Sequence, residues 1–202
     1  HGARVLGVAR RFSGGDPSAK IGPGELAFVG LDVRDERAVV ELFARIERVD
    51  VLVNNAGNAV FRPILDTTGE EMRSLVDTHI VGSFLCAREA LRRMKPQQSG
   101  HIVNVSSIAA FDTFIGSAGY TAAKEGLRGL TRVLTEEARA DGVRVTGLYA
   151  GAIDTPLWDD KPGFARARML APERIASLVV EIVSRPELSV EEIQIRPPGG
   201  NL

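Results

Sequence analysis

The stretch DVLVNNA (residues 50–56) carries the clearest signal for the fold. It begins with consecutive apolar residues, Val51 to Val53, and ends in polar ones at Asn54 and Asn55. A strand with one face in water alternates apolar and polar side chains, whereas a continuous apolar run is typical of a strand covered on both faces. This run therefore predicts a strand inside a parallel sheet, with helices above and below it.

Similar apolar runs recur along the chain and alternate with longer segments of helical periodicity. The predicted strands cover residues 4–9, 26–33, 50–56, 101–107, 144–150 and 191–196. The predicted helices cover residues 35–48, 69–95, 118–140 and 172–184. Asp35 and Pro172 suit the first turns of two of them. This alternation predicts an α/β fold with a doubly wound, mostly parallel sheet and helices on both faces.

The composition restricts what the protein binds. The chain is long enough for one domain, which we expect to span residues 1–202, and its formal net charge of −1 gives no general attraction to nucleic acid or an anionic membrane. No apolar run approaches the roughly 20 residues of a membrane span. Cys86 is the one cysteine, which suits a cytoplasmic protein without disulfides. The histidines are scattered, and no Cys/His spacing predicts a metal site.

Small and polar residues gather where the predicted strands end. The motifs there are NNAG (54–57), SSIAA (106–110) and AGAIDT (150–155). In open parallel sheets, ligands bind beyond these carboxyl ends. The helix that follows SSIAA begins near SAGYTAAKEG (117–126), and it places Tyr120 and Lys124 four residues apart on one helical face. The sequence thus predicts a ligand site that includes this pair.

Tyr120, Lys124 and Ser107 together suit one kind of chemistry. A free phenol titrates near pH 10, and a neighbouring ammonium favours the phenolate, so we expect Lys124 to lower the pKa of Tyr120. The Ser107 hydroxyl can hydrogen-bond an oxygen on which charge develops. Small residues beside Tyr120 leave room for a cofactor and a substrate. Ordinary helices also contain Tyr-x-x-x-Lys, so it is the combination with the strand-end motifs that favours proton delivery during hydride transfer.

In order and spacing, DVLVNNAG, GHIVNVSS, YTAAK and residues 151–155 resemble the motifs of single-domain short-chain dehydrogenases/reductases, over essentially the whole chain. The resemblance implies a Rossmann-like fold and an NAD(P)-dependent oxidoreductase that interconverts a small ketone or aldehyde with an alcohol. It implies Tyr120 as the catalytic acid/base and Ser107 as the partner of the substrate oxygen. Lys124 would bind the nicotinamide ribose and lower the pKa of Tyr120.

The resemblance also implies a set of cofactor contacts. Besides Tyr120 and Lys124, these are Asp32 and Val33 at the adenine, Asn55, Ala56 and Gly57 along the cofactor, and Ile153 and Thr155 at the nicotinamide carboxamide. Relatives selective for NAD carry an acidic residue where Ala9 stands, whereas Arg10 and Arg11 follow at once here. Guanidinium groups bind a 2′-phosphate through paired hydrogen bonds. We therefore predict NADP(H) as the cofactor, with NAD(H) as the alternative.

Three departures from the family pattern bear on activity. The first strand and the glycine-rich phosphate loop are absent from these residues, so we expect the domain to begin about 20–30 residues before His1. His79 stands where the family carries a relay asparagine, and Ala150 replaces a proline. His79 is either a further catalytic residue or a satisfied core histidine.

These departures keep a second function open, a cofactor-binding regulatory or scaffold protein with little or no turnover. Intact Ser107, Tyr120 and Lys124 count against it. A sugar-nucleotide epimerase or dehydratase is disfavoured, because such enzymes need a larger substrate portion than the residues after Thr155 provide.

The remaining signals concern substrate and assembly. Segments that resemble substrate-pocket walls contain Phe111, Phe114, Leu157, Trp158 and Phe164. They indicate either an apolar or aromatic substrate or ordinary packing. The long connection 154–172 is a candidate lid. Helices 69–95 and 118–140 carry apolar or small residues on more than one face and pair across a two-fold axis in relatives, so we predict a homodimer or homotetramer.

Overall fold

The computed structural model describes residues 2–11, 24–159 and 165–200. Its strands are β1 (Val5–Ala9), β2 (Leu26–Gly30), β3 (Val51–Asn54), β4 (Gly100–Ser107), β5 (Val143–Ala150) and β6 (Glu192–Ile195). Its α-helices are α1 (Glu36–Ala44), α2 (Gly69–Val76), α3 (Gly82–Gln97), α4 (Ala118–Arg139) and α5 (Pro172–Val183). Strands and helices alternate as the sequence predicts.

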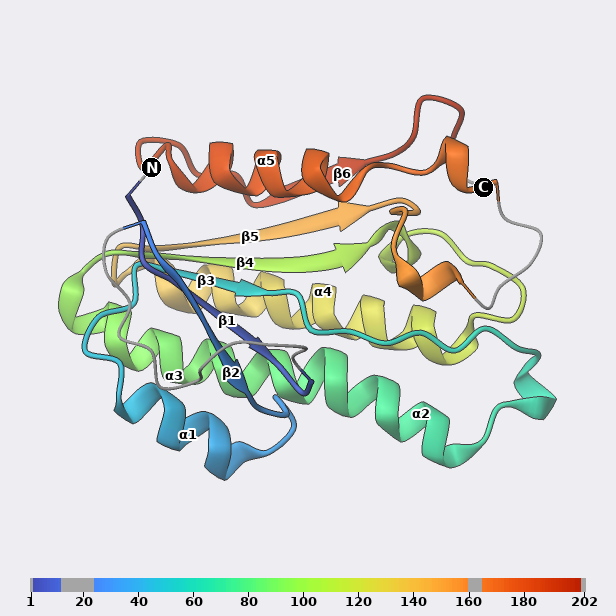
Figure 1. The fold of residues 1–202 in the computed structure, drawn as a ribbon, viewed down its shortest axis with the longest axis horizontal. Helices are drawn as coiled ribbons and strands as arrows, with labels where there is room; N and C mark the ends of the chain where they lie inside the picture. The colour runs from blue at the N-terminus through green and yellow to red at the C-terminus, as the bar shows by residue number, and fades with distance from the viewer. Residues whose placement is uncertain (1, 12–23, 160–164, 201–202) are drawn as a thin grey trace.

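Every pairing between these strands is parallel. One sheet has the order β1–β2, and the other has the order β3–β4–β5–β6. Figure 1 shows α3 and α4 on one side of the four-stranded sheet and α5 on the other. The arrangement confirms the α/β fold with a mostly parallel sheet covered on both faces.

Neighbouring residues of β4 face two separate cores, which explains the continuous apolar runs. Ile102 belongs to a core that includes Met94 of α3, whereas Val103 belongs to one that includes Ile175 of α5. Both β4 side chains are fully buried. Because each face of the strand has its own helix layer, polar residues have no solvent-facing position along the middle of β4.

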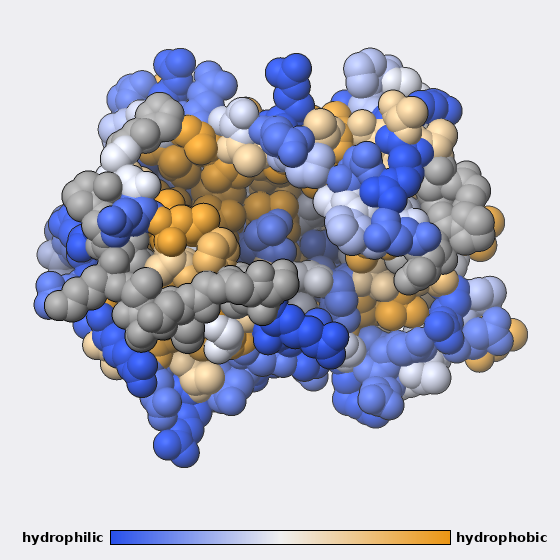
Figure 2. Space-filling model, in the orientation of Figure 1, coloured by the Kyte–Doolittle hydropathy of each residue, from blue (hydrophilic) through white to orange (hydrophobic). Residues whose placement is uncertain are grey.

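The described strands leave a break between β1 and β3, which do not pair with each other. On β3, Val51 and Val53 remain 39% and 42% exposed, unlike the buried middle of β4. Figure 2, in the same orientation as Figure 1, shows a hollow with apolar residues at its floor on this face. The break lies where the sequence analysis expects a further strand.

The predicted helix 69–95 is interrupted, and this corrects the sequence-based boundary. Thr68 and Glu71 form a capping box at the start of α2, with each side chain bound to the other residue's backbone N–H. A π-helical turn, Asp77–Val81, then joins α2 to α3 and contains His79. One wider turn barely alters the apolar periodicity, so the pattern does not reveal it. Such turns occur often at functional sites.

The other helix starts agree with the sequence. The Asp35 side chain accepts a hydrogen bond from the Ala38 backbone N–H and caps α1, and Pro172 is the first residue of α5. The parallel register places Ser107 of β4 opposite Ala150 of β5. The carboxyl ends of β3, β4 and β5 therefore lie along one edge, where the polar motifs meet.

Candidate active site

Tyr120 and Lys124 form one unit in the first two turns of α4. The Nζ atom of Lys124 lies 5.5 Å from the centre of the Tyr120 ring. Lys124 is only 6% exposed, and burial lowers the pKa of its ammonium group from 10.5 to about 8. Such an amine is still mostly protonated at neutral pH. The site therefore contains a buried cation beside a phenol.

The small residues around this pair bring α4 close to its neighbours. A Cβ atom at Gly119 would lie 2.9 Å from Cδ1 of Leu75 in α2. A Cβ atom at Gly126 would meet Cδ1 of Ile80 more closely still. The sequence predicts that small residues here give a ligand access to the phenol. The structure adds that these two glycines are needed for helix packing.

Ser107 ends β4, and its side chain lies close enough to Tyr120 to influence the pKa of the phenol. Its Oγ also accepts a hydrogen bond from the Ala109 backbone N–H at 3.1 Å, which fixes the hydroxyl at the start of a 3₁₀ turn. Burial raises the pKa of Tyr120, and the interaction with the Ser107 side chain opposes that rise. Burial therefore dominates the net direction of the Tyr120 pKa, and a lowering contribution from Lys124 stays a prediction.

His79 packs against the same phenol from the π turn. Its ring lies edge-on to the Tyr120 ring, with centroids 5.8 Å apart, and it is 2% exposed. Its Nε2 lies 2.8 Å from the carbonyl oxygen of Asn58 and 3.4 Å from the Asn58 backbone nitrogen. The shorter contact assigns the proton to Nε2, which donates it to the carbonyl oxygen. Nδ1 is buried and has no hydrogen-bond partner among the described residues. Burial, and then the charge of Lys124, lower the pKa of His79 to about 4, so the ring is neutral at physiological pH.

The NNAG motif lies beside His79. A Cβ atom at Gly57 would approach Cε1 of His79 to 2.9 Å, so a larger residue would displace the ring. Asn55, Ala56 and Gly57 are all exposed. Asn54 points inward instead, and its side-chain amide donates a hydrogen bond to Oδ1 of Asn104 at 2.9 Å. The first asparagine therefore fastens β3 to β4, while the next three residues line the open side.

The predicted adenosine contacts lie at the ends of β1 and β2. Arg10 and Arg11 are exposed directly after β1. The Arg34 guanidinium donates to both carboxylate oxygens of Asp32, at 2.6 to 3.1 Å. These hydrogen bonds, aided by the charges of Arg34 and Arg10, lower the pKa of Asp32 to about 2. Asp32 and Arg10 are therefore close enough to interact electrostatically.

Val33, Ile153 and Thr155 complete the predicted cofactor set. A Cβ atom at Gly82, the first residue of α3, would lie 2.7 Å from Cγ2 of Val33, so the segment after β2 touches α3. Ile153 follows β5 and forms an isolated parallel bridge to the segment before α5. Thr155 precedes a short 3₁₀ helix, Pro156–Trp158. These residues come from different strand ends, as the sequence predicts.

A row of aromatic rings extends from the phenol. The Phe61 ring lies 5.2 Å from the Tyr120 ring at an interplanar angle of 61°. Phe61 also stacks on Trp158, with centroids 5.8 Å apart and planes 12° from parallel. Trp158 is therefore placed near the site as predicted. Sequence reasoning missed Phe61, because a single aromatic residue in a loop carries no motif or periodicity.

Phe111 does not belong to this row, which corrects its prediction as a pocket wall. Its ring lies 4.8 Å from the Tyr149 ring, edge to face, and the Arg128 guanidinium covers it at 4.1 Å. Phe111 follows the 3₁₀ turn after β4, and its ring packs between β5 and α4. Phe114 and Leu157 are partly exposed. Phe164 lies outside the described residues.

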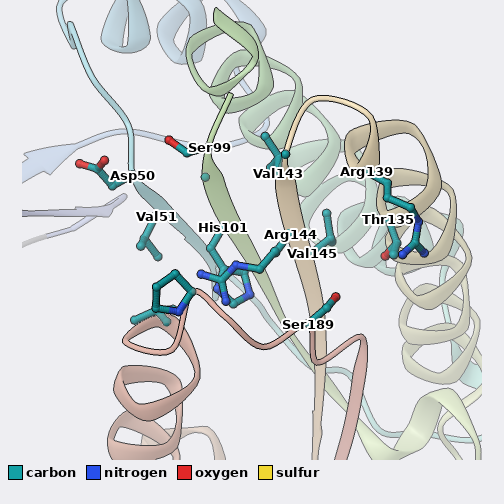
Figure 3. Close-up of a pocket in the computed structure, with 14 residues that line it drawn as sticks. Asp50, Val51, Ser99, His101, Thr135, Arg139, Val143, Arg144, Val145 and Ser189 are labelled. Carbon is teal, nitrogen blue, oxygen red and sulfur yellow. The ribbon is translucent and has the colours of Figure 1, made fainter. Parts of the chain in front are cut away.

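A second buried histidine, His101, lies at the opposite end of the sheet. Figure 3 shows it beside Arg144 in a pocket of about 530 Å³. Its Nε2 is 2.8 Å from Oγ1 of Thr146. Burial, and then the charge of Arg144, lower the pKa of His101 to about 4. Two distant histidines are thus neutral for similar reasons.

Within residues 2–11, 24–159 and 165–200, the His, Cys, Asp and Glu side chains form no group of three or more that could hold a metal ion. In the same part of the chain, none of the helices is both long and apolar enough to cross a bilayer.

A family model described as short chain dehydrogenase matches residues 1–163, which contain Ser107, Tyr120, Lys124 and His79. The chain belongs to the short-chain dehydrogenase/reductase family of oxidoreductases. The sequence-based family assignment is therefore confirmed. Ser107, Tyr120 and Lys124 come together in space as the family motifs imply, but their roles in this chain remain proposals.

Individual relatives agree with this assignment. A sepiapterin reductase of Chlorobaculum tepidum is 36% identical over 172 residues, which cover 85% of this chain and 70% of the relative. A solved short chain dehydrogenase/reductase family protein superposes with a TM-score of 0.84 and 31% identity, over 97% of this chain and 86% of the other. An alcohol dehydrogenase of the archaeon Thermococcus sibiricus, solved with 5-hydroxy-NADP, superposes with a TM-score of 0.79 and 27% identity. The match covers 88% of this chain and 77% of the other.

Proposed function

We propose that this oxidoreductase uses NADP(H) to interconvert a small ketone or aldehyde with the corresponding alcohol. The observation that carries the proposal is the cluster of Ser107, Tyr120 and buried Lys124 at the strand ends. The Tyr120 phenol can donate a proton, the Ser107 hydroxyl can donate a second hydrogen bond, and the Lys124 ammonium supplies a positive charge beside them. The alcohol dehydrogenase relative that was solved with 5-hydroxy-NADP supports the choice of cofactor class.

The residues next to this cluster fit a nicotinamide dinucleotide. Residues 55–57 are exposed beside it, and Gly57 leaves a cradle that a Cβ atom would fill. We propose that Asn55, Ala56 and Gly57 lie along the cofactor, Ile153 and Thr155 at the carboxamide, Asp32 and Val33 at the adenine, and Tyr120 and Lys124 at the nicotinamide ribose.

Two arginines favour NADP(H) over NAD(H). Arg10 and Arg11 are exposed directly after β1, and Ala9 supplies no carboxylate to bind ribose hydroxyls. Arg34 neutralises much of the charge of Asp32, which therefore repels a phosphate less. We propose that Arg10, with Arg11, binds the 2′-phosphate through charge-assisted hydrogen bonds.

The proton step follows from the geometry of the cluster. When bound, NADPH would supply the hydride that the carbonyl carbon accepts. The Tyr120 hydroxyl gives its proton to the carbonyl oxygen as the new C–H bond forms and the C=O double bond becomes single. Ser107 donates a hydrogen bond to the same oxygen. One carbonyl compound, one NADPH and one proton thereby give one alcohol and one NADP⁺.

This step leaves Tyr120 as a tyrosinate. Lys124 would stabilise its negative charge, and His79 would help to return the proton. The ammonium group 5.5 Å from the ring centre stabilises the negative charge, which offsets the burial that raises the Tyr120 pKa. We propose that His79 ends the relay that returns a proton through Lys124, because Nε2 is committed to Asn58 and Nδ1 is left as an acceptor.

A cofactor-binding regulatory or scaffold protein with little turnover is the second candidate. It is favoured by His79 in place of the relay asparagine and by Ala150, which is buried at the end of β5. Such a protein would bind NADPH without oxidising it.

We further propose that residues 1–202 form part of one domain that assembles as a homodimer or homotetramer through α3 and α4. Val81, Phe84 and Val133 on or beside these helices are 37%, 43% and 54% exposed. Adjacent apolar residues of this kind favour self-association. Light scattering that gives a monomer at micromolar concentration would contradict the assembly.

The catalytic proposal is tested by NADPH oxidation. The full-length protein is incubated with a panel of ketones and aldehydes, and absorbance loss is followed with NADPH and with NADH. We expect turnover of at least one carbonyl and a preference for NADPH. Tight NADPH binding without oxidation by any member of the panel would favour the regulatory candidate instead.

A further inference from the structure

The aromatic row beside Tyr120 carries information about the substrate. Phe61 comes from the loop after β3, and Trp158 comes from the 3₁₀ turn after β5. The row therefore joins two strand ends on either side of β4, the strand that ends in Ser107. Phe61 contacts both the phenol and the indole, so the wall continues directly from the proposed proton donor.

The outer ring of this wall is held in place. The Trp158 indole N–H donates a hydrogen bond to the carbonyl oxygen of Ile153 at 2.9 Å. Arg166 binds Asp154 and Asp159 on either side of the turn, each at 2.6 Å. A ring that is already fixed loses little side-chain freedom when a ligand packs on it. The Trp158 indole is thus already held in place before a ligand packs on it.

The chemistry of the two side chains narrows the ligand class. Phe61 offers hydrocarbon alone, and the one polar group of the Trp158 indole is already bonded. Aromatic faces prefer other aromatic rings in offset or edge-to-face arrangements, with centroids about 4.5–7 Å apart, beyond the gain from burial alone. A flat aromatic ring satisfies this geometry, whereas a puckered saturated ring of the same size does not.

We propose that Phe61 and Trp158 form an aromatic wall that selects carbonyl substrates with a planar aromatic ring close to the reacting carbon. The ring packs on the wall, and the carbonyl oxygen points to Tyr120 and Ser107. The wall sets specificity and takes no part in proton transfer. This inference rests on the proposed function, because it takes Tyr120 as the group that the carbonyl approaches.

The first test uses phenylacetone and cyclohexylacetone, which differ in the aromaticity of the ring and carry equally unconjugated carbonyls. We expect the full-length protein to have a higher kcat/KM for phenylacetone. Trp158→Leu and Phe61→Leu should each reduce the ratio of the two kcat/KM values about fivefold or more, mainly through KM, since they remove an aromatic face and keep an apolar side chain. Trp158→Phe should restore part of the ratio.

Phe43→Leu is the matched control, because it makes the same kind of change in the core beside α1, away from the row. Its ratio should equal that of the unaltered protein. A ratio that stays within about twofold of the unaltered protein in both wall variants would overturn the proposal, since stacking would then contribute nothing to selection.

The second test separates the wall from the catalytic proposal. In Tyr120→Phe protein with NADPH, ketone binding is measured without turnover. Trp158 is the one tryptophan of these residues, so comparison with the Tyr120→Phe/Trp158→Phe double variant isolates its fluorescence. Phenylacetone should change that fluorescence with a lower Kd than cyclohexylacetone. Equal Kd values would overturn the wall, whatever the turnover. Selective binding without reduction of either ketone by the unaltered protein would support the wall and contradict the proposed function.

Discussion

The two tyrosines of this chain, Tyr120 and Tyr149, show how different neighbours give one side chain different uses. Burial raises the pKa of both phenols. The Ser107 side chain lowers the pKa of Tyr120, which lies beside the Lys124 ammonium. Tyr149 donates to a Glu192 carboxylate oxygen at 3.3 Å, and that negative charge raises its pKa further. The Arg128 guanidinium lowers the pKa of Tyr149 but does not outweigh Glu192, whereas among the described residues no carboxylate raises the pKa of Tyr120. Tyr120 is therefore the phenol better suited to release a proton.

The rest of each region agrees with this division. Arg128 binds both oxygens of Glu192, and the group ties α4 to β6. Around Tyr120, in contrast, the buried cation has a lowered pKa and Nδ1 of His79 lacks a partner among the described residues. A buried cation with a lowered pKa is therefore the feature that marks the Tyr120 region as the proposed catalytic one.

Removing the cation from the Tyr120 region should have the largest effect on turnover. Lys124→Met keeps an unbranched side chain of similar length but removes the charge that stabilises the tyrosinate and the proposed ribose contact. We expect kcat/KM for carbonyl reduction to fall by more than about 100-fold and NADPH to bind more weakly. The control is Lys95→Met, which removes an exposed lysine paired with Asp141 and should leave both quantities unchanged. Normal turnover by Lys124→Met would contradict the claim that the cation beside Tyr120 makes this tyrosine, and not Tyr149, suited to proton release.

The next prediction concerns Arg10. Arg128 is hydrogen-bonded to Glu192, whereas Arg10 influences nearby Asp32 through its charge. Asp32 is bound by Arg34, and Arg10 acts on it only through its charge. Arg10→Asp should reduce the preference for NADPH over NADH by about tenfold or more, because a carboxylate repels the 2′-phosphate. Kd values for both cofactors measure this. Arg37→Asp makes the same charge change on α1, and an equal shift there would mean that net charge is responsible.

The buried charge of Lys124 should also cost stability. Its pKa is about 8 in the folded protein and 10.5 in the unfolded chain, so the unfolded chain binds more protons between these values. The penalty is therefore complete below about pH 8 and disappears as pH rises to about 10.5. Lys124→Met should raise the free energy of unfolding on the order of 1–3 kcal/mol near pH 7 and progressively less at higher pH. Urea titrations near pH 7 and at about pH 10.5 test this. An equal gain in the free energy of unfolding at the two pH values would contradict the burial argument.

The smallest effects distinguish the two buried histidines. His79→Asn keeps a polar side chain at the proposed relay position, so we expect turnover to stay within about threefold or to rise. His79→Leu removes the polar group and should lower turnover about tenfold, near the lower end for proton-transfer groups. His101→Asn, at the other end of the sheet, should leave the turnover of folded protein unchanged. Equal activity in His79→Asn and His79→Leu would reduce His79 to a packing residue.

The sequence predicted what depends on local pattern. Continuous apolar runs located the strands, Asp35 capped its helix, and the strand-end motifs came together with Tyr120 and Lys124. Features that depend on tertiary contacts were not visible. The π turn at His79 hardly alters the helical periodicity, and Phe61 becomes part of a wall only through Trp158. The direction of the Tyr120 pKa depends on how deeply the phenol is buried, which no spacing rule expresses.

The most direct measurement is carbonyl reduction by Tyr120→Phe beside Tyr149→Phe. Each variant keeps its ring and loses one phenolic hydroxyl, so the pair compares the same chemical change in the two regions. We predict that Tyr120→Phe binds NADPH and unfolds like the unaltered protein but reduces its best ketone at least about 100-fold more slowly, while Tyr149→Phe keeps turnover within a few-fold. Near-normal reduction by correctly folded Tyr120→Phe would show that the proton comes from another group, and would contradict the mechanism.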